Sequence, residues 1–307
     1  NYKELAASLK TKGFTAISET DTEVAAMLID SLYDGDPFAA LKEADQMLEG
    51  AYGFCVMFKD HPGKIYCMRN ASPLVASHTE DGSFIASDMV ALLKYTKDYF
   101  VVPEEHIVVM KSDSITLYTM DGTVVEPKML HVDWDTTAAQ KGGYDFFMQK
   151  EIYDQPEALH NTIMPRIHNG HADFSADNIS DDIFKGVNRV IVTACGTAWH
   201  AGLIGRHLIE AMIRIPVTVE LASEFRYMNP ILDEHTLVVV ITQSGETADS
   251  LAALRLANER GAKTISIVNV KGSSIARESD YVLYTHAGPE IAVASTKAFS
   301  VQCAGMY

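Results

Sequence analysis

Three short segments of this sequence are rich in hydroxyl-bearing and small side chains, and each lies at the end of a predicted strand or the start of a predicted helix. Thr242-Gln243-Ser244-Gly245-Glu246-Thr247 follows the apolar run 237–241, and Cys195-Gly196-Thr197 follows the run 189–194. Val293-Ala294-Ser295-Thr296-Lys297 precedes the apolar C-terminal stretch. Each segment places small residues at a predicted helix N-terminus, where unpaired backbone N–H groups and the helix dipole favour an anion. Since hydroxyls donate hydrogen bonds without adding charge, the pattern predicts a phosphate site.

Helix capping is the alternative explanation of the same residues. Serine and threonine are preferred N-cap residues, so a lone Ser-Gly-Glu-Thr sequence would most often only cap a helix. Three such segments favour a ligand site, because ligands of an open parallel sheet bind beyond the carboxyl ends of its strands. The sequence has neither a P-loop lysine motif nor a GxGxxG motif, which favours a phosphorylated small molecule over a nucleotide.

Two kinds of domain are expected to carry these segments. Residues 1–132 contain closely spaced strand-like runs and a hairpin signal at Asp121-Gly122, which predict an antiparallel α+β domain with helices near 22–32, 37–48 and 88–95. Residues 133–166 predict a connecting helical segment in which Pro156 breaks or starts a helix. Residues 167–307 alternate strands with helices, which predicts an α/β domain with a parallel sheet and helices on both faces.

Composition restricts the class of partner. The chain has 307 residues and a formal net charge of −16, which argues against nucleic acid or an anionic membrane as a partner. The sequence shows no secretion signal and no apolar run long enough to span a membrane. Its four cysteines are scattered, without metal-type spacing. We therefore expect a cytoplasmic protein in a reducing compartment.

Several motifs together resemble one enzyme family. ACGTAWHAG, ELASEFRY, QSGETADS and VASTKAF resemble the first sugar isomerase (SIS) domain of the glutamine–fructose-6-phosphate aminotransferases. SETDTEVAAMLI, LEGAYGF, SPLV and FIASD resemble the later part of their glutaminase domain, and FMQKEIYDQPEAL resembles the joining segment. The resemblance covers essentially the whole chain. It implies an incomplete, Ntn hydrolase-like domain followed by a flavodoxin-like SIS domain truncated at its C-terminal end.

The resemblance also implies a reaction. The family hydrolyses glutamine with an N-terminal cysteine and passes ammonia to two SIS domains, which make glucosamine 6-phosphate from fructose 6-phosphate without a metal or organic cofactor. The nucleophile would precede Asn1, and the second SIS domain, with its lysine, carboxylate base and histidine, would follow Tyr307. We therefore expect no catalytic residue within this chain, no activity of the chain alone, and a homodimer for the complete protein.

The resemblance assigns binding roles to three loops and one aspartate. Sugar-phosphate binding would fall to Cys195, Gly196, Thr197, Ala198, Thr242, Gln243, Ser244, Thr247, Val293, Ala294 and Ser295. Asp21 matches the aspartate that binds the α-amino group of glutamine. Ala198 and Thr242 stand where serine is common in the family, so Ala198 retains only its backbone N–H as a donor while Thr242 retains a hydroxyl.

Three residues near these loops have two explanations each. Cys195 could be a nucleophile, because a helix N-terminus lowers a thiol pKa, but no acid–base partner is near it in sequence. Glu246 could be a general base, although a first-turn glutamate favoured by the helix dipole is the preferred interpretation. Lys297 could contact phosphate or could be a solvated first-turn lysine, with neither favoured.

Other groups are expected to be structural. His168 and His171 could bind a metal, but two histidines alone do not make a site, so a surface loop is favoured. Cys55 and Cys67 lie in strand-like runs and are expected in the core. A second class of function, a non-catalytic sugar-phosphate sensor, remains open, although such regulators carry a basic DNA-binding domain that the acidic first half lacks.

Overall fold

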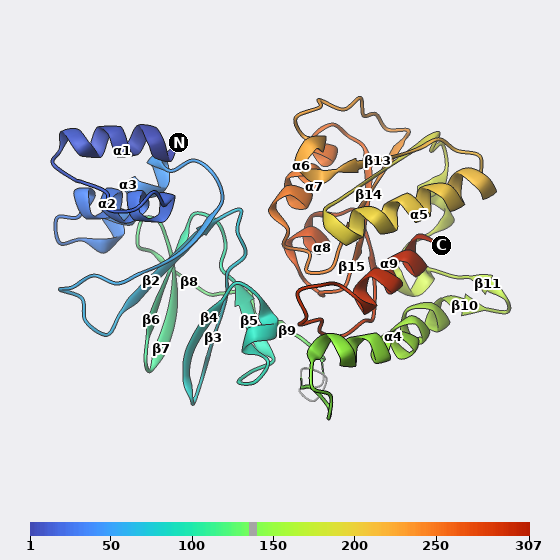
Figure 1. The fold of residues 1–307 in the computed structure, drawn as a ribbon, viewed down its shortest axis with the longest axis horizontal. Coiled ribbons are helices and arrows are strands. Elements are labelled where there is room, and N and C mark those ends of the chain that lie inside the picture. The colour runs from blue at the N-terminus through green and yellow to red at the C-terminus, as the bar shows by residue number, and fades with distance from the viewer. Residues whose placement is uncertain (135–139) are drawn as a thin grey trace. The chain divides into compact units, whose positions relative to one another are not determined.

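The computed structural model describes residues 1–134 and 140–307, which divide into two compact units, Asn1–His131 and Val132–Tyr307. Figure 1 shows the elements of both units. Each unit has hydrophobic clusters of its own. Over the described residues, we find no helix that combines the length and the apolar character needed to cross a membrane.

Antiparallel strands and helices build the first unit. One sheet has the strand order β1-β2-β6-β7-β8 and the other the order β4-β3-β5-β9, and the named strands pair antiparallel. The helices are α1 (Tyr2–Thr11), α2 (Asp21–Leu32) and α3 (Pro37–Met47). The strands are β1 (Tyr52–Val56), β2 (Ile65–Asn70), β3 (Val75–Thr79), β4 (Gly82–Ala86), β5 (Asp98–Val101), β6 (His106–Lys111), β7 (Ser114–Thr119), β8 (Val124–Val125) and β9 (Leu130–His131).

Successive side chains of β2 and β6 point to opposite faces of their sheet, so the sheet packs against a different layer on each face. Met68 and Ile107 point to one face, where they form a core with α1, α2 and α3. Cys67 and Val108 point to the other face and pack with Phe100 of the second sheet. The predicted antiparallel α+β fold is therefore confirmed, with one helical layer and two sheet layers.

Some elements of this unit differ from the predictions. Helix α1 and strand β5 were not predicted, although Leu5 and Leu9 of α1 have the i, i+4 spacing of a buried helix face. Residues 88–95, predicted as a helix, contain only the 3-10 helix Met89–Leu92, which Asp88 caps by accepting the backbone N–H of Val90.

A five-stranded parallel sheet forms the centre of the second unit. Its strand order is β13-β12-β14-β15-β16, and every neighbouring pair is parallel. Its strands are β12 (Arg189–Ala194), β13 (Val217–Leu221), β14 (Thr236–Thr242), β15 (Lys263–Val268) and β16 (Tyr281–Tyr284). Its helices are α4 (Phe147–Ile163), α5 (Gly196–Met212), α6 (Ala222–Phe225), α7 (Ala248–Glu259), α8 (Ser274–Glu278) and α9 (Lys297–Met306). Strand β13 lies on one side of β12, and β14 lies on the other side, which is the flavodoxin-like strand order.

Strand β14 is central and buried along its whole length. Leu237, Val239 and Ile241 face a core that includes residues of α5 and α9, while Val238 and Val240 face a core that includes residues of α7 and α8. Helices therefore cover both faces of the sheet, as the sequence predicts for a continuous apolar run between helices.

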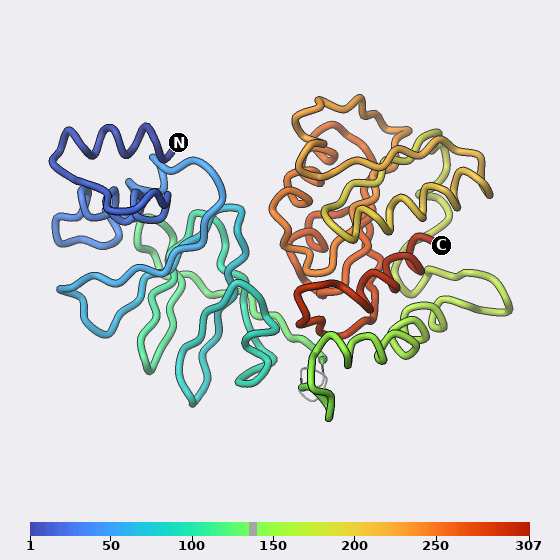
Figure 2. Tube along the Cα trace, in the orientation of Figure 1, coloured from blue at the N-terminus to red at the C-terminus, as the bar shows by residue number. Residues whose placement is uncertain are grey.

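Helix α4 continues through Pro156, contrary to the prediction that this proline breaks or starts a helix. Proline lacks the N–H that would bond the carbonyl of Ile152 four residues earlier. The Gln155 side-chain amide donates to that carbonyl instead, with a distance of 3.0 Å between Nε2 and the oxygen. In the trace of Figure 2, α4 runs beside α9, with which it is in contact.

Candidate functional site

A cavity of about 260 Å³ opens beyond the carboxyl ends of β12 and β14. These strands are adjacent, and Ala194 of β12 pairs with Ile241 of β14, so the two following loops begin side by side. The strand order reverses here, which is where open α/β sheets bind ligands. Nine of the eleven predicted sugar-phosphate residues line the cavity: Cys195, Thr197, Ala198, Thr242, Gln243, Ser244, Thr247, Val293 and Ser295. Gly196, the first residue of α5, and Ala294, in the loop before α9, are not part of the lining.

The loop that follows β14 is shaped by its own hydroxyl groups. Thr242 Oγ1 accepts the backbone N–H of Gly245 at 3.2 Å and lies 3.4 Å from Thr247 Oγ1. Ser244 Oγ accepts the backbone N–H of Glu246 at 3.2 Å. The hydroxyls of Thr242 and Thr247 therefore converge on the cavity wall.

Gly245 is required by both conformation and space. Its φ is +70°, a left-handed conformation in which side chains are disfavoured. A Cβ there would lie 2.5 Å from the Cβ of Ser273 and 2.9 Å from Cγ2 of Val268, and it would overlap the Ser273 hydroxyl. The loop is thus packed directly against the segment that follows β15.

The capping alternative finds little support in the geometry. Helix α7 begins at Ala248 with Thr247 in the N-cap position, and within the described chain the Thr247 side chain makes no capping hydrogen bond. The Ser244 hydroxyl bonds Glu246, which precedes the helix. Neither hydroxyl is used to cap α7, so both remain available to a ligand.

The cavity wall contains few charged groups. Its lining carries hydroxyls, amides and a thiol, together with the carboxylate of Glu290. Glu290 accepts the backbone N–H groups of Thr296 at 2.9 Å and Ala298 at 3.0 Å, and the Ser295 hydroxyl at 3.0 Å. Because these donors lie at the N-terminus of α9, the helix dipole offsets the charge of Glu290.

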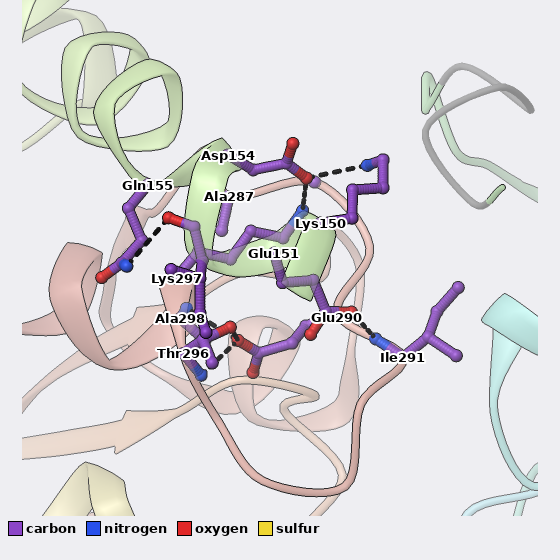
Figure 3. A network of polar contacts seen from close by, with 12 residues as sticks. Lys150, Glu151, Asp154, Gln155, Ala287, Glu290, Ile291, Thr296, Lys297 and Ala298 are labelled. Carbon is purple, nitrogen blue, oxygen red and sulfur yellow. Dashed lines mark hydrogen bonds and ion pairs between the residues drawn. The ribbon is translucent and has the colours of Figure 1, made fainter. Parts of the chain in front are cut away.

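Lys297, which could have been a phosphate contact or a solvated lysine, is instead buried and paired with a carboxylate. Only 2% of its surface is exposed. Its Nζ lies 3.1 Å from Oδ2 of Asp154 on α4, and Figure 3 shows the two side chains pointing toward each other. Lys150 binds the same oxygen at 2.7 Å. Burial alone would raise the pKa of Asp154, but hydrogen bonds from Lys150 and Lys297 outweigh it and hold that pKa below its usual value.

Helix α4 also holds the loop that closes one side of the cavity. Oε1 of Glu151, a residue that is 2% exposed, accepts the backbone N–H groups of Ile291 at 2.6 Å and Ala292 at 3.1 Å (Figure 3). Ser300 of α9 donates to Gln155 of α4 at 2.5 Å. The segment predicted to be only a connection therefore positions loop 290–296.

Sequence reasoning missed several residues of the site. Ile241, Ser250, Glu290, Ala292 and Gln302 also line the cavity. Glu151 shares the buried face of α4 with Ala158 and Thr162. A carboxylate on the buried face of a helix was the available signal, because such a group is rarely buried without a partner.

Glu246 and Cys195, the two candidate catalytic residues, make structural contacts in the described part of the chain. Glu246 precedes α7, so the first-turn interpretation is wrong, and its Oε1 accepts the backbone N–H of Ser274 at 2.7 Å. Cys195 lines the cavity and accepts a hydrogen bond from Ser250, which is no general base.

His168 and His171 are exposed and are cross-strand neighbours in the hairpin of β10 (Ile167–His168) and β11 (His171–Ala172). No metal-binding cluster of three or more suitable side chains occurs in the described ranges.

The cysteines of the first unit are placed differently from each other. Cys67 is fully buried, as predicted, but Cys55 is exposed because β1 is an edge strand. The two residues are direct cross-strand neighbours, and a hydrogen bond from Cys67 lowers the pKa of Cys55 to about 7.

Asp21 lies in the first unit, at the first position of α2. Its side chain is exposed and contributes to a second cavity, of about 400 Å³, together with Tyr52 and Ser72. Its Oδ1 accepts a 3.4 Å hydrogen bond from the Thr22 hydroxyl. An exposed carboxylate beside a cavity can bind an ammonium group.

Comparisons with known proteins agree with this division. Residues 183–306 match the SIS domain model, and residues 1–94 match a glutamine amidotransferase domain model. The C-terminal domain of glucosamine-fructose-6-phosphate aminotransferase from Francisella tularensis is a similar solved structure, with 41% identity and a TM-score of 0.53. The match covers 54% of this chain and 47% of that chain. The chain therefore combines a glutamine amidotransferase-type domain with a SIS domain.

Curated relatives are similar over the whole chain. The glutamine–fructose-6-phosphate aminotransferase (isomerizing) of Clostridium tetani is 48% identical over 309 residues, which cover 100% of this chain and 51% of the relative. The protein of the same name from Symbiobacterium thermophilum is 49% identical over 304 residues, covering 98% of this chain and 50% of the relative. This chain spans about half the length of the curated relatives it matches. The resemblance inferred from the sequence motifs is confirmed.

Proposed function

We propose that this chain, which is homologous over its whole length to about half of the glutamine–fructose-6-phosphate aminotransferases, supplies the sugar-phosphate cradle and a glutamine-binding aspartate of such an enzyme. The complete enzyme would make glucosamine 6-phosphate and glutamate from fructose 6-phosphate and glutamine. The observation that carries the proposal is the cavity beyond β12 and β14, where three hydroxyl-rich loops meet.

The proposed domain division follows from the same resemblance. Residues 1–132 would be the later part of the glutaminase domain, 133–166 the connecting helical segment and 167–307 the first SIS domain. We propose a cytoplasmic homodimer for the complete protein, with small molecules rather than nucleic acid or membrane as its ligands. The net charge of −16 supports that choice, because it disfavours polyanionic partners.

Phosphate binding would use neutral donors. Helices α5 and α7 both begin at the cavity. The first backbone N–H groups of a helix have no acceptor within that helix and can donate to a ligand. The hydroxyls of Ser244 and Thr247 would add hydrogen bonds to the phosphate oxygens. The helix dipoles would favour the anion without a lysine or arginine, in keeping with the cavity lining.

Removing either hydroxyl is expected to weaken sugar-phosphate binding. Each hydrogen bond to a charged group contributes about 1.5–3 kcal/mol, so Ser244→Ala and Thr247→Ala should each raise the Kd for fructose 6-phosphate by roughly tenfold or more. Calorimetric titration of each variant measures this change. Thr218→Ala, which removes an exposed hydroxyl from β13, is the control and should bind like the parent.

The capping alternative predicts the opposite pair of results. If Ser244 and Thr247 only capped α7, the two alanine variants would melt at lower temperature and keep their affinity for fructose 6-phosphate. Unchanged affinity in both variants would therefore contradict the proposed role of these hydroxyls.

The proposed role of Asp21 makes a separate prediction for the complete enzyme. Asp21→Asn should raise the KM for glutamine strongly, because a charge-assisted hydrogen bond to the ammonium becomes a neutral one, at a cost of about 1.5–3 kcal/mol. The KM for fructose 6-phosphate should stay the same. Steady-state kinetics with each substrate varied in turn tests both statements, and unaltered glutamine kinetics would remove Asp21 from the glutamine site.

A further inference from the structure

Gln302 places a buried amide in the wall of the cavity. It lies inside α9, one turn before Met306, and only 3% of its surface is exposed. It lines the same cavity as Ser244 and Thr247. Met306 belongs to the hydrophobic cluster of the central sheet, so the face of α9 that carries Gln302 is the one turned toward the sheet.

The Oε1 atom of Gln302 has no hydrogen-bond partner in the described parts of the chain. Buried polar atoms are nearly always paired, because an unpaired one loses its hydrogen bonds to water without replacement. The structure describes other buried side-chain atoms in this condition on Glu151, Thr193, Trp199, Ser266 and Ser273. Of this described set, Gln302 alone lines the cavity.

The chemistry of the unpaired atom restricts what can satisfy it. Oε1 of an amide is an acceptor and needs a donor. The oxygens of a phosphate dianion are acceptors, so the phosphate cannot satisfy it, whereas a sugar hydroxyl both donates and accepts. The neighbouring Nε2 supplies two donors, so one amide can accept from one hydroxyl and donate to another.

We propose that Gln302 is a specificity-determining residue that binds hydroxyl groups of the sugar. The loop 242–247 then holds the phosphate and Gln302 recognises the polyol, so that the cavity selects a phosphorylated sugar over phosphate alone. This inference rests on the proposed function, which supplies the sugar phosphate. It adds a ligand contact from α9 that the three loops do not provide.

The test compares Gln302→Met with the parent chain. Methionine keeps the length of the side chain and removes its polar atoms. Calorimetric titration with fructose 6-phosphate and with inorganic phosphate, beside a melting curve of the unliganded protein, gives three readouts. Gln46→Met, which makes the same replacement at an exposed position of α3, is the control and should match the parent in all three.

The inference predicts a specific combination of results. Gln302→Met should bind fructose 6-phosphate about tenfold more weakly, bind inorganic phosphate as the parent does, and melt at the same or a higher temperature, because an unpaired buried atom has been removed. A lowered melting temperature with unchanged sugar-phosphate affinity would show a structural role and overturn the inference. An equal loss of affinity for both ligands would also overturn it, since the amide would then bind the phosphate.

Failure of the inference is distinct from failure of the proposed function. If the parent binds fructose 6-phosphate and Gln302→Met binds it equally well, only the role of Gln302 is wrong. If the parent chain itself binds no fructose 6-phosphate, the proposed function fails and the inference falls with it.

Discussion

Gly245→Ala is expected to weaken sugar-phosphate binding by about a hundredfold or more and to lower the melting temperature of the chain. An alanine at φ +70° costs about 1–2 kcal/mol, and its Cβ meets Ser273 and Val268 at distances that force the loop to move. Overpacking of this kind costs about 1–3 kcal/mol more. Because the loop cannot move without displacing Ser244 and Thr247, we expect the Kd for fructose 6-phosphate to rise by about a hundredfold or more, by the loss of two hydrogen bonds.

Gly261→Ala is the matched control for this substitution. Gly261 also has a positive φ, +76°, but a Cβ there would meet no atom of the described chain within 4 Å, and the residue lies beyond the far end of α7. It should show the conformational cost alone, with unchanged affinity. If Gly245→Ala and Gly261→Ala gave the same melting curve and the same affinity, the close approach of the loop to Ser273 would not matter for the site.

The second large effect is expected at Glu151. Glu151→Leu leaves the partly buried N–H groups of Ile291 and Ala292 without their acceptor, at a cost of about 1.5–3 kcal/mol for each hydrogen bond to the carboxylate that is lost. Loop 290–296 should lose its fixed position, so we expect both a lower melting temperature and weaker binding of fructose 6-phosphate. Thermal unfolding and calorimetric titration measure the two effects.

Two further variants separate positioning from general destabilisation. Glu151→Gln keeps an oxygen that can accept both N–H groups, so it should restore most of the affinity lost in the leucine variant. Glu157→Leu changes an exposed residue of the same helix and should leave affinity unchanged. An affinity in Glu151→Leu equal to that of the parent would mean that α4 does not position the loop.

The strands and loops of the second unit could be predicted from the sequence because their signals are local. The unbroken apolar run ending at Ile241 predicts a strand buried on both faces, and β14 has that character from end to end. Strand β12 and helices α5 and α7 likewise follow from runs of apolar residues with the appropriate period. Since parallel strands end at one edge of a sheet, the sequence also predicts that the segments after β12 and β14 lie close together.

The contacts that could not be predicted join residues far apart in the chain. Lys297 pairs with Asp154, and Ile291 pairs with Glu151, across about 140 positions of sequence. Nothing near Lys297 distinguishes a solvated lysine from one buried beside a carboxylate on another helix. Glu246 shows the same limit, because its partner Ser274 lies on the neighbouring helix α8.

The first unit shows how partner strands decide burial. Cys55 and Cys67 occupy similar strand-like runs, so the sequence predicts that both are buried in the core. The structure places Cys67 in a strand with neighbours on both sides and Cys55 in the edge strand β1, so only Cys67 is buried. Position within a sheet is a property of the whole fold, which a local pattern does not contain.

The most direct test of the central claim is a calorimetric titration of the unmodified chain with fructose 6-phosphate, repeated in the presence of inorganic phosphate. We predict saturable binding at one site per chain, competition by inorganic phosphate, and a weaker site in Ser244→Ala. Binding that inorganic phosphate does not affect, or the absence of any saturable binding by the folded chain, would contradict the assignment of the cavity beyond β12 and β14 as a sugar-phosphate site.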